Sequence, residues 1–138
     1  MNYTRLVLSA VAAWIVYFAV GGLVSGMLFA GYYRPYSAVY RGKEEVMSRF
    51  PVGIAGMLVA MLVLALIYAK GYEGGSGLME GLRFGLLVGI FVVGAVVADE
   101  YVTLNIGRDL ALVMAVGRLF GWVVVGATIG LIYRPAGH

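Results

Sequence analysis

The sequence predicts an all-α fold: an integral membrane bundle of four transmembrane helices. Hydrophobic residues make up 62% of the chain and charged residues only 12%, against about 45–50% and about 25% in a soluble domain. Four apolar runs nearly fill the 138 residues, and each is close to the ~20 residues that a membrane-spanning helix needs. The runs are continuously apolar, whereas the strands of a membrane barrel alternate over about ten residues.

The first two spans are predicted from uninterrupted apolar stretches. Residues 6–32 contain no charged side chain, and this run exceeds the apolar core of a signal peptide, about 7–15 residues. Residues 52–70 follow Pro51, which we expect at the first helical position, where its missing N–H costs nothing. Both runs are therefore predicted to be retained transmembrane helices.

The last two spans, residues 80–102 and 109–133, must carry charge into the membrane. The uncharged centre of the third span, residues 84–98, extends roughly 22 Å as a helix, less than the ~30 Å hydrocarbon core. Pro135 and Gly137 follow the fourth span and predict its end. All four spans together form one predicted domain over residues 1–138.

A weak internal repeat relates residues 51–71 to residues 115–135. A true repeat would build the bundle from two similar helical hairpins. The limited set of residues used by helices in lipid explains the same likeness without duplication. Both interpretations stay open at this point.

Charged residues inside the spans are the candidate site. An unpaired charge at the bilayer centre costs at least ~2.5–3.5 kcal/mol, so Arg118 in the fourth span needs a partner. Helical side chains lean toward the helix N-terminus, which directs Arg118 toward the turn after Asp99 and Glu100, and we predict an ion pair with one of these two. Glu80 and Arg83 are three residues apart and are predicted to pair locally.

The intramembrane ion pair has three interpretations. It is a structural pair that sets the register of two helices, or part of an ion path, proton path or polar substrate site. In the third interpretation its charge is presented to a partner subunit or a lipid phosphate.

Glycine accounts for 21 of the 138 residues, about twice the usual 7%. Small residues four apart lie on one helix face and let two backbones approach closely in lipid. Each helix is therefore predicted to carry a packing groove, filled within the chain or by another subunit. The predicted helix-packing glycines are Gly22, Gly26, Gly56, Gly81, Gly85, Gly89, Gly117, Gly121, Gly126 and Gly130.

The loop between the first two spans is aromatic and basic. Tyrosine rings favour the headgroup level, and basic residues there attract anionic lipid. Residues 43–49 are predicted to form a short interfacial helix. Two interpretations fit this loop. It is a general belt at the membrane interface, or it is a specific docking surface for a lipid headgroup or another protein. Its predicted contact residues are Tyr32, Tyr33, Arg34, Tyr36, Tyr40, Arg41 and Lys43.

Several chemistries are excluded by composition. The chain has no cysteine, and its one histidine is His138, the last residue. Disulfides, thiolate metal sites and bis-histidine haem are therefore absent. No nucleophile–base set lies within the spans, so we expect no enzyme activity, no cofactor, no metal and no nucleic-acid partner.

Two stretches of the chain are similar to known sequences: Gly-Gly-Ser-Gly-Leu-Met-Glu-Gly-Leu-Arg-Phe-Gly from residue 74 and Leu-Ile-Tyr-Arg-Pro from residue 131. They resemble parts of uncharacterised small four-helix bacterial membrane proteins. The resemblance implies a four-helix fold in a bacterial cytoplasmic membrane, and it implies no activity.

Two functions fit the sequence. The first is a non-catalytic accessory or assembly subunit of a larger membrane complex, with an energy-transducing complex as one candidate. Its partners are the lipid bilayer and other membrane subunits or a second copy. The alternative is a small homo-oligomeric transporter or channel that uses Arg118 with Asp99 or Glu100.

Overall fold

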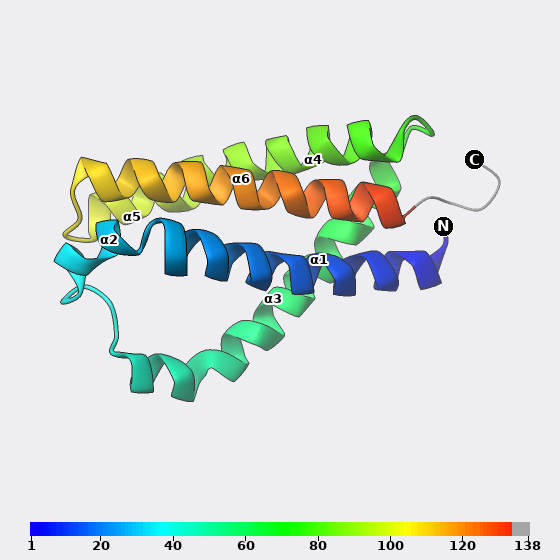
Figure 1. The fold of residues 1–138 in the computed structure, drawn as a ribbon. Helices are drawn as coiled ribbons and strands as arrows, with labels where there is room; N and C mark the ends of the chain where they lie inside the picture. The colour runs from blue at the N-terminus through cyan, green and yellow to red at the C-terminus, as the bar shows by residue number, and fades with distance from the viewer. Residues whose placement is uncertain (134–138) are drawn as a thin grey trace.

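The computed structural model describes residues 1–133 of the chain, and these residues form a helical bundle without strands. Four helices are long and apolar enough to cross a membrane. The first of them begins at the same end of the molecule at which the last one ends (Figure 1). The predicted stop at Pro135 and Gly137 lies outside the described residues. The long helices are α1 (Tyr3–Leu23), continued by a π-helical turn (Val24–Leu28); α3 (Lys43–Gly71); α4 (Gly77–Val92), continued by a second π-helical turn (Val93–Val97) and α5 (Ala98–Thr103); and α6 (Arg108–Ile132).

Side chains and glycines set the ends of these helices. The Asn2 side chain accepts a hydrogen bond from the Arg5 N–H at 3.1 Å at the start of α1. The Ser76 hydroxyl accepts from the Met79 N–H at the start of α4. Both are N-caps that satisfy N–H groups left without intrahelical partners. In the turn before α4, Gly74 has φ of 87°, a conformation that glycine adopts without steric cost. The first connection contains two short helices, α2 (Ala30–Tyr33) and a 3₁₀ turn (Arg34–Tyr36).

Helix α3 differs from the prediction at its start. It begins at Lys43 and holds Pro51 in its interior, so residues 43–49 are helical as predicted but continue into the span, and the first-position role of Pro51 was wrong. Glu45 forms ion pairs with Arg41 and with Arg49, one turn before and after it, which supports the extra helical turns. The proline removes one backbone hydrogen bond, and α3 is exposed there, so the carbonyl that loses its partner can meet water or headgroups.

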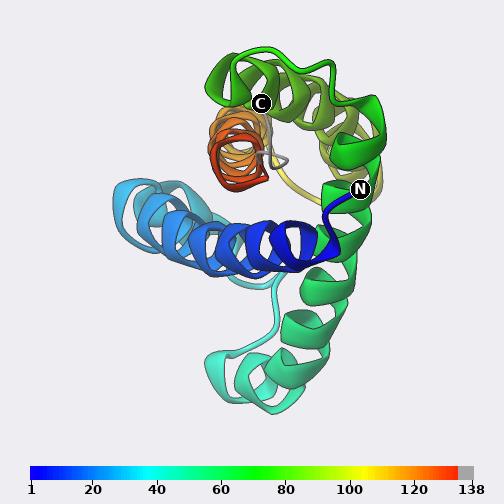
Figure 2. The same cartoon turned by 90° about the vertical axis from the view of Figure 1, so that its right-hand side faces the viewer.

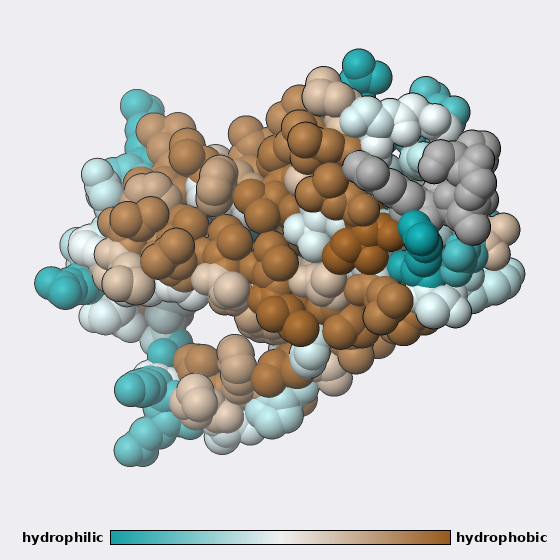
Figure 3. All heavy atoms as spheres, turned by 45° about the vertical axis from the view of Figure 1, so that its right-hand side comes forward, coloured by the Kyte–Doolittle hydropathy of each residue, from teal (hydrophilic) through white to brown (hydrophobic). Residues whose placement is uncertain are grey.

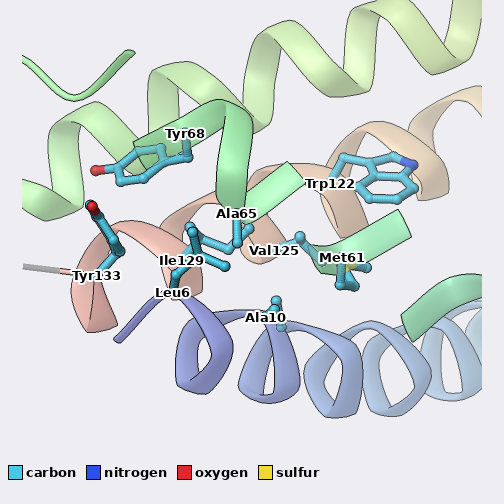
Figure 4. Close-up of a cluster of buried hydrophobic side chains, with 10 residues drawn as sticks. Leu6, Ala10, Met61, Ala65, Tyr68, Trp122, Val125, Ile129 and Tyr133 are labelled. Atoms are coloured by element: carbon cyan, nitrogen blue, oxygen red, sulfur yellow. The ribbon is translucent and has the colours of Figure 1, made fainter. Parts of the chain in front are cut away.

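The main core lies where α1, α3 and α6 meet (Figure 4). Ala10 and Ala13 on α1 are fully buried, and these small side chains bring α1 close to its neighbours. The Ser9 hydroxyl, also fully buried, donates to the Leu6 carbonyl oxygen at 2.8 Å. The core residues are Leu6, Ala10, Ala13, Met61, Ala65, Tyr68, Trp122, Val125, Ile129 and Tyr133. A smaller core at the other end of α6 joins Val97, Ile106, Leu110 and Met114.

The two hairpins are not alike. Helix α4 packs along α6, whereas α3 runs obliquely past α1 (Figures 1 and 2). The buried residues of α3, Met61, Ala65 and Tyr68, all lie in the C-terminal half of that helix. At the crossing, the Trp14 indole N–H donates to the Ile54 carbonyl oxygen at 3.1 Å. The N-terminal half of α3 is exposed apart from its contacts with α1, and it diverges from the other helices toward its start (Figure 1), with an open gap beside it in Figure 3.

The surface has a broad hydrophobic middle with hydrophilic residues toward its two ends (Figure 3). Such a distribution is typical of a chain whose helices cross a bilayer, because lipid leaves no water to solvate polar groups in the centre. The lengths of the four apolar helices and the hydrophobic middle of the surface together indicate a membrane-integrated bundle.

Candidate functional site

The intramembrane pair joins Arg118 on α6 to Glu100 on α5. The Arg118 Nη2 atom lies 3.6 Å from Glu100 Oε2, and the two side chains are 36% and 28% exposed. This separation is longer than a hydrogen bond. Glu100 Oε2 is buried and has no hydrogen-bond partner among residues 1–133. The pair is therefore an electrostatic contact whose hydrogen-bonding capacity is largely unused.

Glu100 follows the π-helical turn Val93–Val97 and lies on the helix face that packs against α6. Val97, the last residue of that turn, is buried against Leu110 and Met114 of α6. Glu100 follows three residues later and so lies on the same helix face. Asp99 is exposed and has no ion pair within the described part of the chain.

A pocket of about 80 Å³ lies beside Arg118, between α6 and the end of α1. Ser25 and Tyr33 contribute polar groups to it, and Val20 and Trp122 contribute apolar walls. A volume of this size accommodates several water molecules. The site therefore combines a partly exposed cation, a carboxylate and room for water or a small polar ligand.

Tyr40 covers the same end of α6 from the first connection. Its hydroxyl donates to the Met114 sulfur at 3.8 Å, and its ring lies 5.9 Å from that of Tyr33. Burial raises the pKa of the Tyr40 hydroxyl, and the nearby Tyr33 and Glu100 raise it further. Tyr40 is therefore held neutral close to the ion pair.

Tyr36 ties this connection to the start of α6. Its hydroxyl donates to Asp109 Oδ1 at 2.8 Å, and this hydrogen bond is the main reason that the pKa of Tyr36 is raised. A side chain at Gly107 would collide with the Tyr36 hydroxyl. Glycine at position 107 thus leaves room for the contact.

The rest of the aromatic and basic loop is mostly exposed. Tyr33 and Tyr36 are half-buried, Arg41 pairs with Glu45, and Lys43 begins α3. The members exposed at the surface are Tyr32, Arg34, Tyr40, Arg41 and Lys43. Tyr36 and Tyr40 thus attach the loop to α6 through Asp109 and Met114, and the basic side chains stay available to headgroups.

The predicted pair of Glu80 with Arg83 is wrong. The Glu80 carboxylate turns back to the preceding loop, where Oε1 accepts from the Gly75 N–H at 2.5 Å and Oε2 from the Glu73 N–H at 3.1 Å. A carboxylate in the first helical turn gains from nearby unpaired N–H groups and from the helix dipole, which outweighs a weak exposed ion pair. Arg83 has no ion pair within residues 1–133.

Five of the predicted packing glycines form the contact between α4 and α6. Gly81, Gly85 and Gly89 are buried on α4, and Gly126 and Gly130 are buried on α6. A Cβ atom at Gly85 would lie 2.8 Å from Val123 Cα, and one at Gly130 would lie 2.8 Å from Gly81 Cα. No larger residue fits at these positions unless the two helices move apart.

The other predicted packing glycines behave differently. At Gly22, Gly26, Gly56 and Gly121 no described atom of the chain lies within 4 Å of the position that a Cβ would take. Of the two interpretations left open by the sequence, packing within the described chain therefore does not apply to these four glycines. Gly117 is intermediate: a Cβ there would meet Val24 Cγ1 at 3.2 Å.

Three tertiary contacts had no signal in the sequence: Trp14 with Ile54, Tyr36 with Asp109, and Tyr40 with Met114. Each joins residues at least 40 positions apart, beyond the reach of helical spacing. Within residues 1–133 no group of three or more histidine, cysteine, aspartate or glutamate residues could hold a metal ion.

Comparison of the chain with protein-family models, curated proteins and solved structures found no match.

Proposed function

We propose that this protein is a non-catalytic accessory or assembly subunit of a larger membrane complex, and that the glycine faces left uncovered on α1 and α3 receive a transmembrane helix of another subunit. The observation that carries the proposal is the contrast between the two sets of glycines. Five glycines are closed at the α4–α6 contact (Gly81, Gly85, Gly89, Gly126 and Gly130), whereas Gly22, Gly26 and Gly56 meet nothing in the described chain.

The physical argument concerns how helices associate in lipid. Burying apolar surface contributes little there, so close backbone approach at small residues supplies the contact energy. Glycine in a helix costs about 1 kcal/mol relative to alanine, and an uncovered glycine offers no packing in return. A partner helix over these faces would recover that cost.

The exposed half of α3 supports the same function. In this N-terminal half Met47 and Val52 are 59% and 76% exposed, and Ile54 and Phe50 contact Trp14 and Phe18 of α1. A helix so weakly packed within its own chain is suited to packing against a second protein. Phe18 and Phe50 lie with ring centroids 5.8 Å apart, so this half retains one aromatic contact with α1.

The first experiment extracts the chain from its own membranes in a mild detergent, separates it on a native gel and identifies the proteins that migrate with it. Migration at fixed stoichiometry with other membrane subunits is expected. Migration only as a monomer or as copies of itself contradicts the proposal.

A second experiment maps the contact. The chain has no cysteine, so single cysteines at positions 22, 26 and 56 can carry a photo-crosslinker. We expect all three to label the same partner protein, and a cysteine at Phe91, which is 70% exposed on α4, not to label it. Gly22→Leu combined with Gly56→Leu should release the partner. The matched control Gly94→Leu, at another glycine with open space around it, should retain the partner.

A small transporter or channel is the second candidate, and the pocket at Arg118 is the observation that favours it. Between that pocket and the Tyr133 end of the bundle lies the apolar core of Ala10, Met61, Val125 and Ile129. A path through a single chain is therefore interrupted, and transport would need a route between subunits. Flux across liposomes that Arg118→Leu abolishes would favour this candidate over the assembly subunit.

A further inference from the structure

A second pocket, of about 330 Å³, lies at the opposite end of the molecule between the end of α3 and the start of α4. Tyr68 and Phe84 meet there with ring centroids 5.4 Å apart. Ile67 and Leu87 extend the wall along the hydrophobic surface, where they are 52% and 67% exposed. The pocket thus joins a turn at the end of the span to an apolar groove that faces lipid.

Charged residues of both signs line this pocket without pairing. Arg83, Glu73 and Glu80 all contribute to its wall, yet no ion pair within 4.0 Å joins Arg83 to either glutamate. The Glu80 carboxylate is already held by the N–H groups of Glu73 and Gly75. One cation, Arg83, and one carboxylate, Glu73, have no ion-pair partner among residues 1–133 and are therefore left to a ligand.

We propose that this pocket binds one phospholipid with a zwitterionic, amine-bearing headgroup. Its phosphate contacts Arg83, its ammonium group contacts Glu73, and its acyl chains lie along Ile67 and Leu87. This site lies apart from the uncovered glycines, and the inference does not rest on the proposed assembly function.

The position of Arg83 suits a lipid phosphate. It lies in the second turn of α4, and its side chain leans toward the helix N-terminus, so the guanidinium reaches the headgroup level while its stem stays along apolar surface. The planar guanidinium presents paired N–H donors that match a phosphate.

Glu73 supplies the selectivity. An ammonium headgroup donates charge-assisted hydrogen bonds to a carboxylate, whereas a trimethylated headgroup has no N–H to donate. The pocket should therefore favour phosphatidylethanolamine over phosphatidylcholine with the same acyl chains.

The test is native mass spectrometry of the full chain in mild detergent with either lipid added. Arg83→Gln should lower retention of both lipids roughly tenfold, the loss expected for a charged hydrogen bond. Arg83→Lys should restore much of it, and Glu73→Gln should reduce phosphatidylethanolamine to the level of phosphatidylcholine. Lys70→Gln removes a cation from the same end outside the pocket wall and should change neither. Circular dichroism and gel filtration check that each variant is folded.

Three outcomes overturn the inference. Arg83→Gln and Lys70→Gln retain lipid equally, the unmodified chain holds both lipids equally, or soluble glycerophosphoethanolamine displaces the lipid at matched concentration. The last result would mean that the pocket recognises a headgroup compound and gains nothing from the apolar groove.

Discussion

The Arg118 guanidinium on α6 lies 3.6 Å from the Glu100 carboxylate on α5, and within residues 1–133 neither side chain forms a hydrogen bond. Two opposite charges that meet without hydrogen bonds gain from attraction but keep much of their desolvation cost. Their partial exposure further reduces the energy of the pair.

Removing one member of this pair should destabilise the protein more than removing both. Glu100→Gln leaves Arg118 without its counter-charge and should cost about 1–2 kcal/mol, below the 3–5 kcal/mol of a fully buried pair because both side chains are partly exposed. The double variant Arg118→Leu with Glu100→Gln should recover most of this loss. Reversible unfolding in mixed micelles measures both, and an additive loss in the double variant would contradict a coupled pair.

Alanine at Gly85 should destabilise the bundle, and alanine at Gly22 should not. A Cβ at Gly85 would lie 2.8 Å from Val123 Cα and 2.5 Å from the Trp122 carbonyl oxygen, so α4 and α6 must separate, at a cost of about 1–3 kcal/mol. At Gly22 the space is open, and the helix gains up to about 1 kcal/mol. The melting temperatures of the isolated chain provide the comparison. Equal shifts at the two positions would refute the α4–α6 contact.

Trp14→Phe should loosen α3 while leaving the main core intact. The substitution removes the indole N–H that donates to Ile54, a net loss of about 0.5–1.5 kcal/mol. We expect a broader distance distribution between spin labels at positions 15 and 47, measured by pulsed electron paramagnetic resonance. Leu8→Phe, at a position 56% exposed on the same helix, serves as the control. An unchanged distribution in Trp14→Phe would show that the hydrogen bond does not position α3.

Tyr36 should ionise above the usual tyrosine range. The hydrogen bond to Asp109 raises its pKa above 10.0 in the folded chain, so its contribution to stability is complete below the unfolded pKa and is lost as the pH rises through the folded one. Subtracting the ultraviolet titration of Tyr36→Phe from that of the unmodified chain isolates this ionisation. Its midpoint should lie above 10 and fall in Asp109→Asn. A midpoint at or below 10 in the unmodified chain would be inconsistent with the contact.

The sequence by itself determined that the fold is a bundle of helices able to cross a membrane. Four long apolar runs permit only structures that satisfy their own backbone hydrogen bonds in lipid, and this constraint does not depend on how the helices pack. It also placed Arg118 within a span and Asp99 and Glu100 before the following turn. Those positions required only chain order and the rise of a helix.

Only the tertiary structure decided which of these residues meet. The rotation of each helix about its axis selected Glu100 over Asp99 and directed Gly85 toward α6, and the path of the turn before α4 gave Glu80 to backbone N–H groups in place of Arg83. The oblique course of α3 left Gly22 and Gly56 uncovered. Residue spacing shows which side chains share a face, but the neighbour of that face depends on contacts between residues far apart in the chain.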